Sequence, residues 1–198
     1  MATIPSHDED CQRGLRDATD DLLTAMIYLG EDPLREGLED TPRRVAKAWL
    51  ELMSGYHQDP ADIFTTFEKD GYEDLVIVKD IPFYSMCEHH LLPFFGHVHI
   101  GYIPHERIVG LSKLARLVEI YSHRLQVQER LTRQVAEELF ERLEADAVMV
   151  VVEAEHLCMA MRGVAKPGTL TITSAVRGHF VDDSVLRGEF LSLIARKP

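Results

Sequence analysis

The sequence predicts an α+β protein built around a mainly antiparallel sheet. Hydrophobic residues recur at helical spacing in some segments and alternate with polar residues in others. The segments run in the order two helices, two strands, two helices, two strands and a closing helix, without the strict alternation typical of a parallel sheet. With 198 residues, 45% hydrophobic and 27% charged, the chain can bury a core as one domain or as one domain with an appendage.

Two helices are expected before the first strand. The first covers residues 9–29, where leucine and methionine recur at helical spacing until Gly30 stops the pattern. The second covers residues 42–54. Thr41 is placed to cap it, and Pro42 falls in the first turn, where a missing N–H group costs little.

In the middle of the chain, the spacing of the hydrophobic residues changes twice. Residues 75–83 (LVIVKDIPF) have the composition of a strand, and residues 96–104 alternate apolar and polar side chains as a half-buried strand does. Helical spacing then returns over residues 110–124 and 126–145. These four segments would supply one strand pair and two helices to pack on it.

The last part of the chain supplies the second strand pair. Residues 147–163 are rich in valine, and residues 169–178 alternate threonine with apolar residues; residues 182–196 have a helical pattern. If the first of these strands runs its full length, its even-numbered residues share one face. His156 and Cys158 would then lie side by side.

The formal net charge of −12 is concentrated near the N-terminus. Residues 1–75 contain 18 acidic and 7 basic residues, whereas residues 76–198 contain 15 and 14. The acidic residues therefore belong mainly to the N-terminal third of the chain. Spread evenly, this charge would argue against nucleic acid or an anionic membrane, and neither is expected as a partner. The nearly neutral residues 76–198 could still hold a local anion site.

The chain is expected in the cytoplasm. It starts MATIPSHDED, with acidic residues where a secretory signal has a basic and then an apolar run. No segment approaches the ~18–20 apolar residues of a membrane span. Three cysteines are too few for a disulfide scaffold, so metal binding or burial is favoured for them. Cys11 is expected to be an ordinary packed or surface thiol.

Two cysteine-histidine pairs carry the strongest chemical signal. CEHH spaces Cys87 and His90 so that both can bind one metal from a turn, and EHLC supplies His156 and Cys158. Together they favour a zinc site. Four ligands would make it closed and structural, whereas three would leave a position for water and a spare histidine to move protons. His89 is a further candidate, and surplus histidines favour catalysis.

A basic helix face is the second signal. Ser112, Lys113 and Arg116 fall on one side of a predicted helix and suit a phosphate or carboxylate group. Arg162 would join the EHLC pair if the strand reached that far. A solvated charged face is the alternative interpretation. Combined with zinc and surplus histidines, the pattern favours metal-assisted hydrolysis of a phosphorylated substrate.

Four segments resemble the GTP cyclohydrolase I family. In the family's order they are TPRRVAKAW, CEHHLLPFFGHVHIGYIP, GLSKLARLVEIYSHRLQVQERLT and VVVEAEHLCMAMRGV, and the similarity covers roughly residues 15–195. The resemblance implies the tunnelling fold, a four-stranded antiparallel sheet with two helices on one side. We expect this catalytic domain over residues 75–198, after an N-terminal helical extension over residues 1–74. It also implies a homodecamer of two pentamers with active sites between subunits.

The same resemblance implies a reaction and a site. The reaction is the zinc-dependent hydrolytic opening of the guanine imidazole ring of GTP, giving 7,8-dihydroneopterin triphosphate and formate in the first step of folate or other pterin biosynthesis. The implied zinc ligands are Cys87, His90 and Cys158, and the implied proton-transfer residues are His89 and His156. The implied substrate contacts are Lys113, Arg116 and Arg162 to the triphosphate, Ser112 to a phosphate or the ribose, and Gln128 and Glu129 to guanine.

Two other functions remain possible at the level of sequence. The CEHH and EHLC pairs could form a closed structural zinc site in an oligomeric binding module. Alternatively, the fold could carry another chemistry, since other tunnelling-fold enzymes act on pterins or deazapurines. The joint presence of CEHH, GLSK, QVQER and HLCMAMRG in one chain argues against this last possibility.

Overall fold

The computed structural model describes residues 9–195, with side chains at residue 14 and from residue 17 onward. The side chain of Cys11 therefore lies outside the described residues. The chain divides into two compact units, one ending at Met53 and the other beginning at Ser54. The expected division between residues 74 and 75 falls inside the second unit and stays a prediction.

The first unit contains the two predicted helices, α1 (Glu9–Tyr28) and α2 (Thr41–Leu52). Pro42 lies in the first turn of α2, as expected. Thr41 is not the N-cap, however, because the helix already includes it and Asp40 takes the preceding position. The Asp40 side chain makes no capping hydrogen bond; its carboxylate instead pairs with Arg43 and Arg44.

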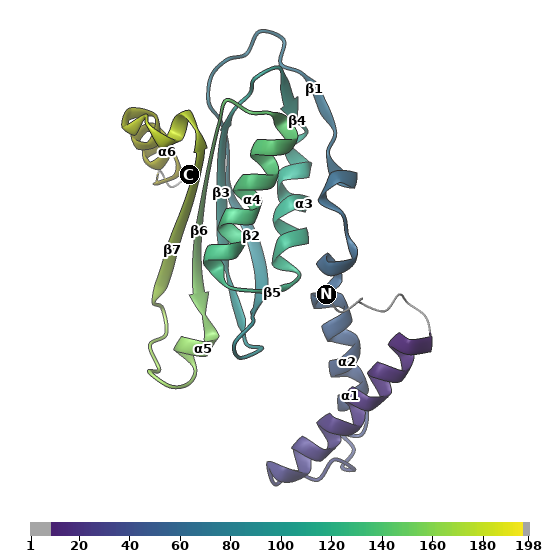
Figure 1. Ribbon diagram of the computed structural model, residues 1–198. Helices are drawn as coiled ribbons and strands as arrows, with labels where there is room; N and C mark the ends of the chain where they lie inside the picture. The colour runs from purple at the N-terminus through teal and green to yellow at the C-terminus, as the bar shows by residue number, and fades with distance from the viewer. Residues whose placement is uncertain (1–8, 196–198) are drawn as a thin grey trace. The chain divides into compact units, whose positions relative to one another are not determined.

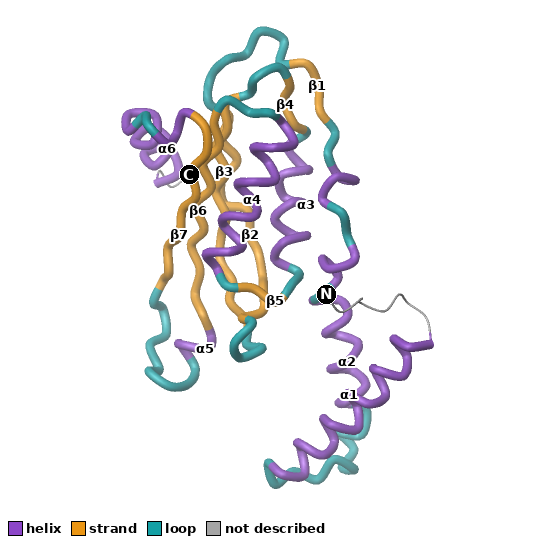
Figure 2. Tube along the Cα trace, viewed as in Figure 1, coloured by secondary structure: helices purple, strands orange, loops and turns teal. Residues whose placement is uncertain are grey.

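The second unit is built on a sheet with strand order β5-β2-β3-β6-β7 (Figure 2). Its four long strands pair antiparallel, as predicted: β2 (Val76–Cys87), β3 (Pro93–Ile103), β6 (Ala147–His156) and β7 (Leu170–Gly178). The fifth strand, β5 (Leu125–Gln126), adds two residues parallel to the end of β2. The α+β class is confirmed, with five strands where four were expected.

Helices cover both faces of this sheet (Figure 1). The predicted pair, α3 (Leu111–Ser122) and α4 (Gln128–Leu143), packs on one face through a core that includes Val98, Ile100, Leu114, Leu131, Val135 and Val150. The closing helix, α6 (Ser184–Ala195), packs on the other face, where Phe190 meets Met149 and Val151. Alternation along β6 thus divides its side chains between two cores.

The largest departure from expectation lies in residues 147–163. The predicted strand stops at His156, and the chain turns into a single helical turn, α5 (Leu157–Ala160). The remaining elements are short: the strands β1 (Thr66–Glu68) and β4 (Arg107–Val109), which pair with each other, and the 3₁₀ turns Ser54–His57, Pro60–Ile63 and His179–Val181. No helix among residues 9–195 is long and apolar enough to cross a membrane.

Candidate active site

The pairing of β3 with β6 brings the two cysteine-histidine motifs together. Phe94, near the start of β3, lies opposite His156, the last residue of β6. The CEHH motif occupies the turn that leads into β3, and the EHLC motif leads out of β6 into α5. Both motifs therefore emerge at one end of the sheet (Figure 1).

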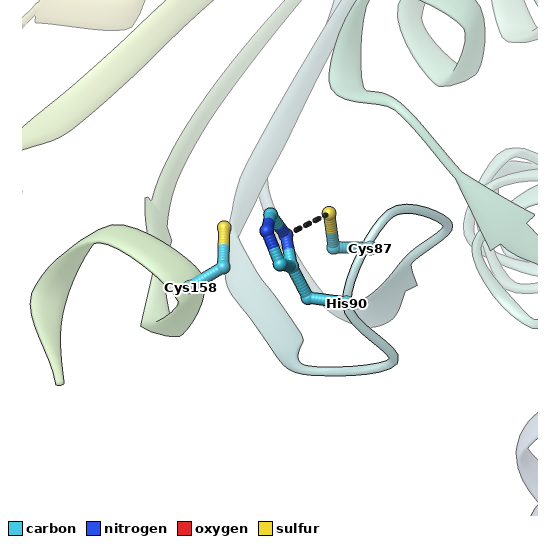
Figure 3. Close-up of side chains that lie close together, drawn as sticks. All are labelled: Cys87, His90 and Cys158. Atoms are coloured by element: carbon cyan, nitrogen blue, oxygen red, sulfur yellow. Dashed lines mark hydrogen bonds between the residues drawn. The ribbon is translucent and has the colours of Figure 1, made fainter. Parts of the chain in front are cut away.

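Three side chains from these motifs converge at that end. The ligand atoms of Cys87, His90 and Cys158 all lie within 4.8 Å of one another, and Figure 3 shows them approaching from the turn and from α5. Cys87 is buried, Cys158 is partly buried and His90 is exposed. Two sulfurs and one imidazole nitrogen form a donor set that suits zinc. The group is thus able to bind a metal ion, as the sequence predicted.

The two thiols influence each other. Burial and the neighbouring Cys87 thiol raise the pKa of Cys158, and neither cysteine is in a disulfide. A cation placed between the sulfurs would act in the opposite direction and favour the thiolates. The site is therefore one in which metal binding and thiol ionisation would be linked.

The CEHH turn is held in place from two sides. The Cys87 N–H donates to the carbonyl of Leu92 at 2.9 Å, and the Leu91 N–H donates to the carbonyl of Cys87 at 2.9 Å. Leu91 has φ of 51°, the left-handed conformation that closes the turn. The Glu88 carboxylate accepts hydrogen bonds from two nitrogens of Arg130 in α4, which keeps the pKa of Glu88 below its usual range.

The two other motif histidines lie in different surroundings. His89 is exposed, with its Nδ1 3.8 Å from the sulfur of Cys87. His156 is partly buried, stacks on Phe94 with ring centroids 4.6 Å apart, and has its Nε2 2.8 Å from Oε1 of Gln128. Burial lowers the pKa of His156. His156 is not in the Cys-His-Cys group, so three ligands are gathered and a histidine stands beside them.

Gln128 and Glu129 are neighbours in α4 but face different environments. The Gln128 side chain is 1% exposed, and protein atoms bind its amide on both sides. Glu129 is exposed and lines an open groove of about 500 Å³ between α4 and β7, together with Thr132, Arg133 and Thr173. Only Glu129 therefore offers its side chain to a ligand.

The basic residues of α3 lie away from the Cys-His-Cys group within one chain. The C-terminal end of α3 is close to it, because the Ser85 hydroxyl, two residues before Cys87, donates to the carbonyl of Ser122 at 2.7 Å. Ser112 precedes Ser122 by ten residues, which corresponds to ~15 Å of helix. Lys113 and Arg116 share that N-terminal half of α3.

Arg162 is placed differently from expectation. The strand ends at His156, so strand alternation does not place His156, Cys158 and Arg162 on one face, and that part of the prediction was wrong. The turn into α5 brings Cys158 back toward the sheet instead. Arg162 follows α5, is exposed, and its charge lowers the pKa of Cys158, partly offsetting the burial.

The sequence analysis gave no individual role to three residues around His156 and the turn. Phe94 resembled any other core aromatic, and Arg130 was one of several cations between residues 110 and 135. Thr173 hydrogen-bonds both Gln128 and Thr132. The alternating threonines of TLTITS were a weak signal that polar groups line one face of β7.

Comparisons of the sequence with known proteins indicate one family. A model of that family, described as GTP cyclohydrolase I, matches residues 18–195. A protein named GTP cyclohydrolase 1 from Halalkalibacterium halodurans is 60% identical over 84% of this chain and 89% of its own length. Another of that name from Dehalococcoides mccartyi (strain ATCC BAA-2266 / KCTC 15142 / 195) is 58% identical over 87% and 92%. Among solved structures, the apo form of a QueF-like archaeosine synthase has a TM-score of 0.44 and 20% identity, covering 54% of this chain and 96% of that one.

Proposed function

The chain belongs to the GTP cyclohydrolase I family, and we propose that it performs the family's hydrolytic opening of the guanine imidazole ring of GTP at the Cys87-His90-Cys158 centre. The products would be 7,8-dihydroneopterin triphosphate and formate. The observation that carries this proposal is the convergence of two thiols and an imidazole from two distant motifs. GTP is the substrate of the family.

The metal of this centre is proposed to be zinc. Two sulfurs and one nitrogen within 4.8 Å of one another match the donors and the ligand count of catalytic zinc sites, which keep one position open. Zinc bound at this centre would lower the pKa of a water molecule and so supply the nucleophile that attacks C8 of the guanine ring. Cys87, His90 and Cys158 would hold the ion, and the Glu88–Arg130 ion pair would keep the turn that carries two of these ligands in place.

The proton transfers are assigned to His89 and His156. Opening the imidazole ring requires protons at ring nitrogen and later at ribose oxygen, and histidine can accept and donate near neutral pH. His156 is held beside the metal ligands by Phe94 and Gln128. His89 is exposed next to Cys87, where it could reach a bound ligand.

The substrate contacts are proposed to come from more than one subunit. The carboxylate of Glu129 suits the two adjacent N–H donors of guanine, and Lys113, Arg116 and Arg162 suit the triphosphate, with Ser112 on a phosphate or the ribose. In one chain, Lys113 and Arg116 lie nine and six residues before Ser122, the end of α3 that is close to the metal ligands. A neighbouring copy would have to supply them, which fits the tunnelling-fold homodecamer with active sites between subunits.

A closed structural zinc site is the main competing function, and cysteine substitutions test both. Cys87→Ser and Cys158→Ser should each abolish stoichiometric zinc and formate release from GTP, because each removes one of three ligands. Cys11→Ser is the matched control and should keep both. Retention of stoichiometric zinc in the Cys87 and Cys158 variants would contradict the ligand assignment, and a zinc-loaded wild-type protein that releases no formate would contradict the enzymatic function.

A further inference from the structure

The surroundings of Gln128 carry an inference about which nitrogen of His156 exchanges protons. It rests on the proposed proton-transfer role of His156. The Gln128 side chain is 1% exposed at the first turn of α4, where it joins α4 to β6 and β7. Its two amide atoms have separate sets of partners, and these sets determine how the amide is oriented.

The nitrogen end of the amide faces acceptors. Nε2 of Gln128 lies 3.0 Å from the carbonyl oxygen of Val152, 2.9 Å from that of Thr171 and 3.2 Å from Oγ1 of Thr173. Carbonyl oxygens can only accept hydrogen bonds. Reversing the amide would place its own oxygen against two carbonyl oxygens, so the NH₂ group must point this way.

The threonine partner supports the same orientation. The Thr132 hydroxyl donates to the main-chain carbonyl of Gln128 at 2.7 Å, which uses its single hydrogen. The Thr173 hydroxyl, 2.6 Å from Oγ1 of Thr132, therefore donates to Thr132. Its oxygen is left to accept from Gln128, in agreement with the NH₂ orientation.

The oxygen end of the amide then fixes the imidazole. Oε1 of Gln128 is an acceptor only, and it lies 2.8 Å from Nε2 of His156. Nε2 must therefore carry a hydrogen in the neutral ring. Turning the ring over would put a C–H group at that place, and the parallel stack on Phe94, 4.6 Å away at 3°, limits rotation out of the plane.

We infer that Gln128 is a positioning residue that fixes His156 in the Nε2–H tautomer, so that Nδ1 is the atom that takes and gives protons in the reaction. Among the described residues, none forms a hydrogen bond with Nδ1 of His156. Neutral His156 takes a proton at Nδ1, and the imidazolium so formed returns it from Nδ1 while Nε2–H stays bound to Gln128. This assigns to the Gln128 side chain a role other than the guanine contact that the family resemblance implied.

Kinetics of zinc-loaded, full-length variants test the inference. Gln128→Met keeps the length of the side chain but removes both amide functions, and it should lower kcat for formate release ~10–100-fold while KM for GTP changes little. Gln126→Met is the matched control, because Gln126 is also 1% exposed and its amide binds Tyr121 and Gln134 instead. Its kcat should stay near that of the wild type.

A double variant shows whether Gln128 acts through His156. Since two residues that work as one unit are not additive, Gln128→Met combined with His156→Ala should be no slower than His156→Ala alone. Additive losses, or a rise in KM with kcat unchanged, would overturn the inference and return Gln128 to guanine binding or to a purely structural role. A fully active His156→Ala variant would instead overturn the proposed role of His156.

Nitrogen NMR of wild-type zinc-loaded protein with ¹⁵N-labelled histidine gives a readout that does not depend on whether Gln128→Met folds. The His156→Ala variant identifies the His156 signals. The inference expects a protonated, pyrrole-type Nε2 and a pyridine-type Nδ1 for His156 in the neutral ring. The reverse pattern in the wild type would overturn it, and where Gln128→Met folds, loss of the single pattern in that variant would support it.

Discussion

At the scale of single residues, burial separates the histidines of this protein into two kinds. His90 and His89 are exposed in the CEHH turn, whereas His99 is 4% exposed and His156 is partly buried. Burial lowers the pKa of both His99 and His156, because removing the imidazolium from water disfavours the charged form. The alternation over residues 96–104 predicted a half-buried strand with His99 on its open face. That prediction was wrong for His99, because it pairs with Val151 on the face that α6 covers.

His99 provides a prediction about pH and stability. Its Nδ1 accepts a hydrogen bond at 3.1 Å from the main-chain N–H of Asp80, which requires an unprotonated nitrogen. Burial has the largest effect on the pKa of His99 and lowers it. The charges of Asp80 and Glu153 raise this pKa, whereas those of His97 and Lys79 lower it further. The pKa of His99 in the folded state is therefore below its unfolded value of ~6.5. The unfolded chain binds more protons as the pH falls, and stability present above pH ~6.5 is lost below it.

His99→Gln should therefore reduce the loss of stability between about pH 7 and pH 5. Thermal unfolding of wild type and variant across this range measures it, and the difference in Tm between the two pH values should be smaller in the variant. His179→Gln, at an exposed histidine, is the control and should keep the wild-type dependence. An unchanged pH dependence in His99→Gln would contradict this account of His99.

The candidate site also shows the limits of prediction at this scale. The spacings of CEHH and EHLC predicted that the two motifs would meet at one metal site, and the choice of Cys87, His90 and Cys158 as the ligands came from the family resemblance. The reason given for the second motif was wrong, since Cys158 lies in a helical turn and not on a strand face. The hydrogen-bond partners of Gln128 come from β6 and β7, and no local sequence pattern around residue 128 predicts them.

At the scale of elements, the long strands and helices were predictable because each repeats its pattern several times. The seven predicted segments of the second unit all correspond to observed elements, with ends that differ by a few residues or, in 147–163, by a turn. β5 has two residues and β1 and β4 have three, too few to show a period. The packing of α6 on the sheet could not be predicted either, because it depends on a glycine in β3 that leaves room for α6.

This glycine is Gly101. A Cβ atom there would lie 2.6 Å from a ring carbon of Phe190 in α6, so the aromatic ring would have to move. Gly101→Ala should destabilise the protein by ~1–3 kcal/mol, as overpacking of cores does. At ~2–4 °C per kcal/mol for a chain of this size, thermal unfolding can detect it.

Gly188 within α6 is the matched comparison. A Cβ atom there would have no neighbour within 4 Å. Gly188→Ala should therefore stabilise by ~0.5–1 kcal/mol through helix propensity alone. Equal effects of the two substitutions would show that the close approach of α6 to β3 does not govern stability here.

At the scale of the whole molecule, the arrangement of charges within one chain leaves the proposed site incomplete. The Cys-His-Cys group lies at the end of the sheet where α3 finishes, while Lys113 and Arg116 lie toward the end where α3 begins. We propose, on the family resemblance, that each active site is shared between subunits. The composition of that site stays a prediction, and the structure adds that Lys113 and Arg116 lie away from the Cys-His-Cys group within one chain.

Complementation between impaired variants tests this sharing. Cys87→Ser should be nearly inactive alone through loss of a metal ligand. Lys113→Ala should be ~10–150-fold slower through loss of a charge-assisted phosphate contact of ~1.5–3 kcal/mol. Co-expressed, they should form mixed assemblies in which some sites take their metal ligands from one variant and their phosphate-binding lysine from the other, so formate release should rise. Activity no greater than that of the separate variants would place both residues in one subunit's site.

In the proposed site, three protein ligands hold the metal while His156 moves protons beside it. Measuring zinc content and formate release together in His156→Ala tests this arrangement. The account predicts a folded protein with about one zinc per chain and a rate lowered by ~10²–10⁴, since the ligands remain and one acid-base group is lost. Loss of zinc together with a lowered unfolding temperature would instead show that His156 closes a structural site.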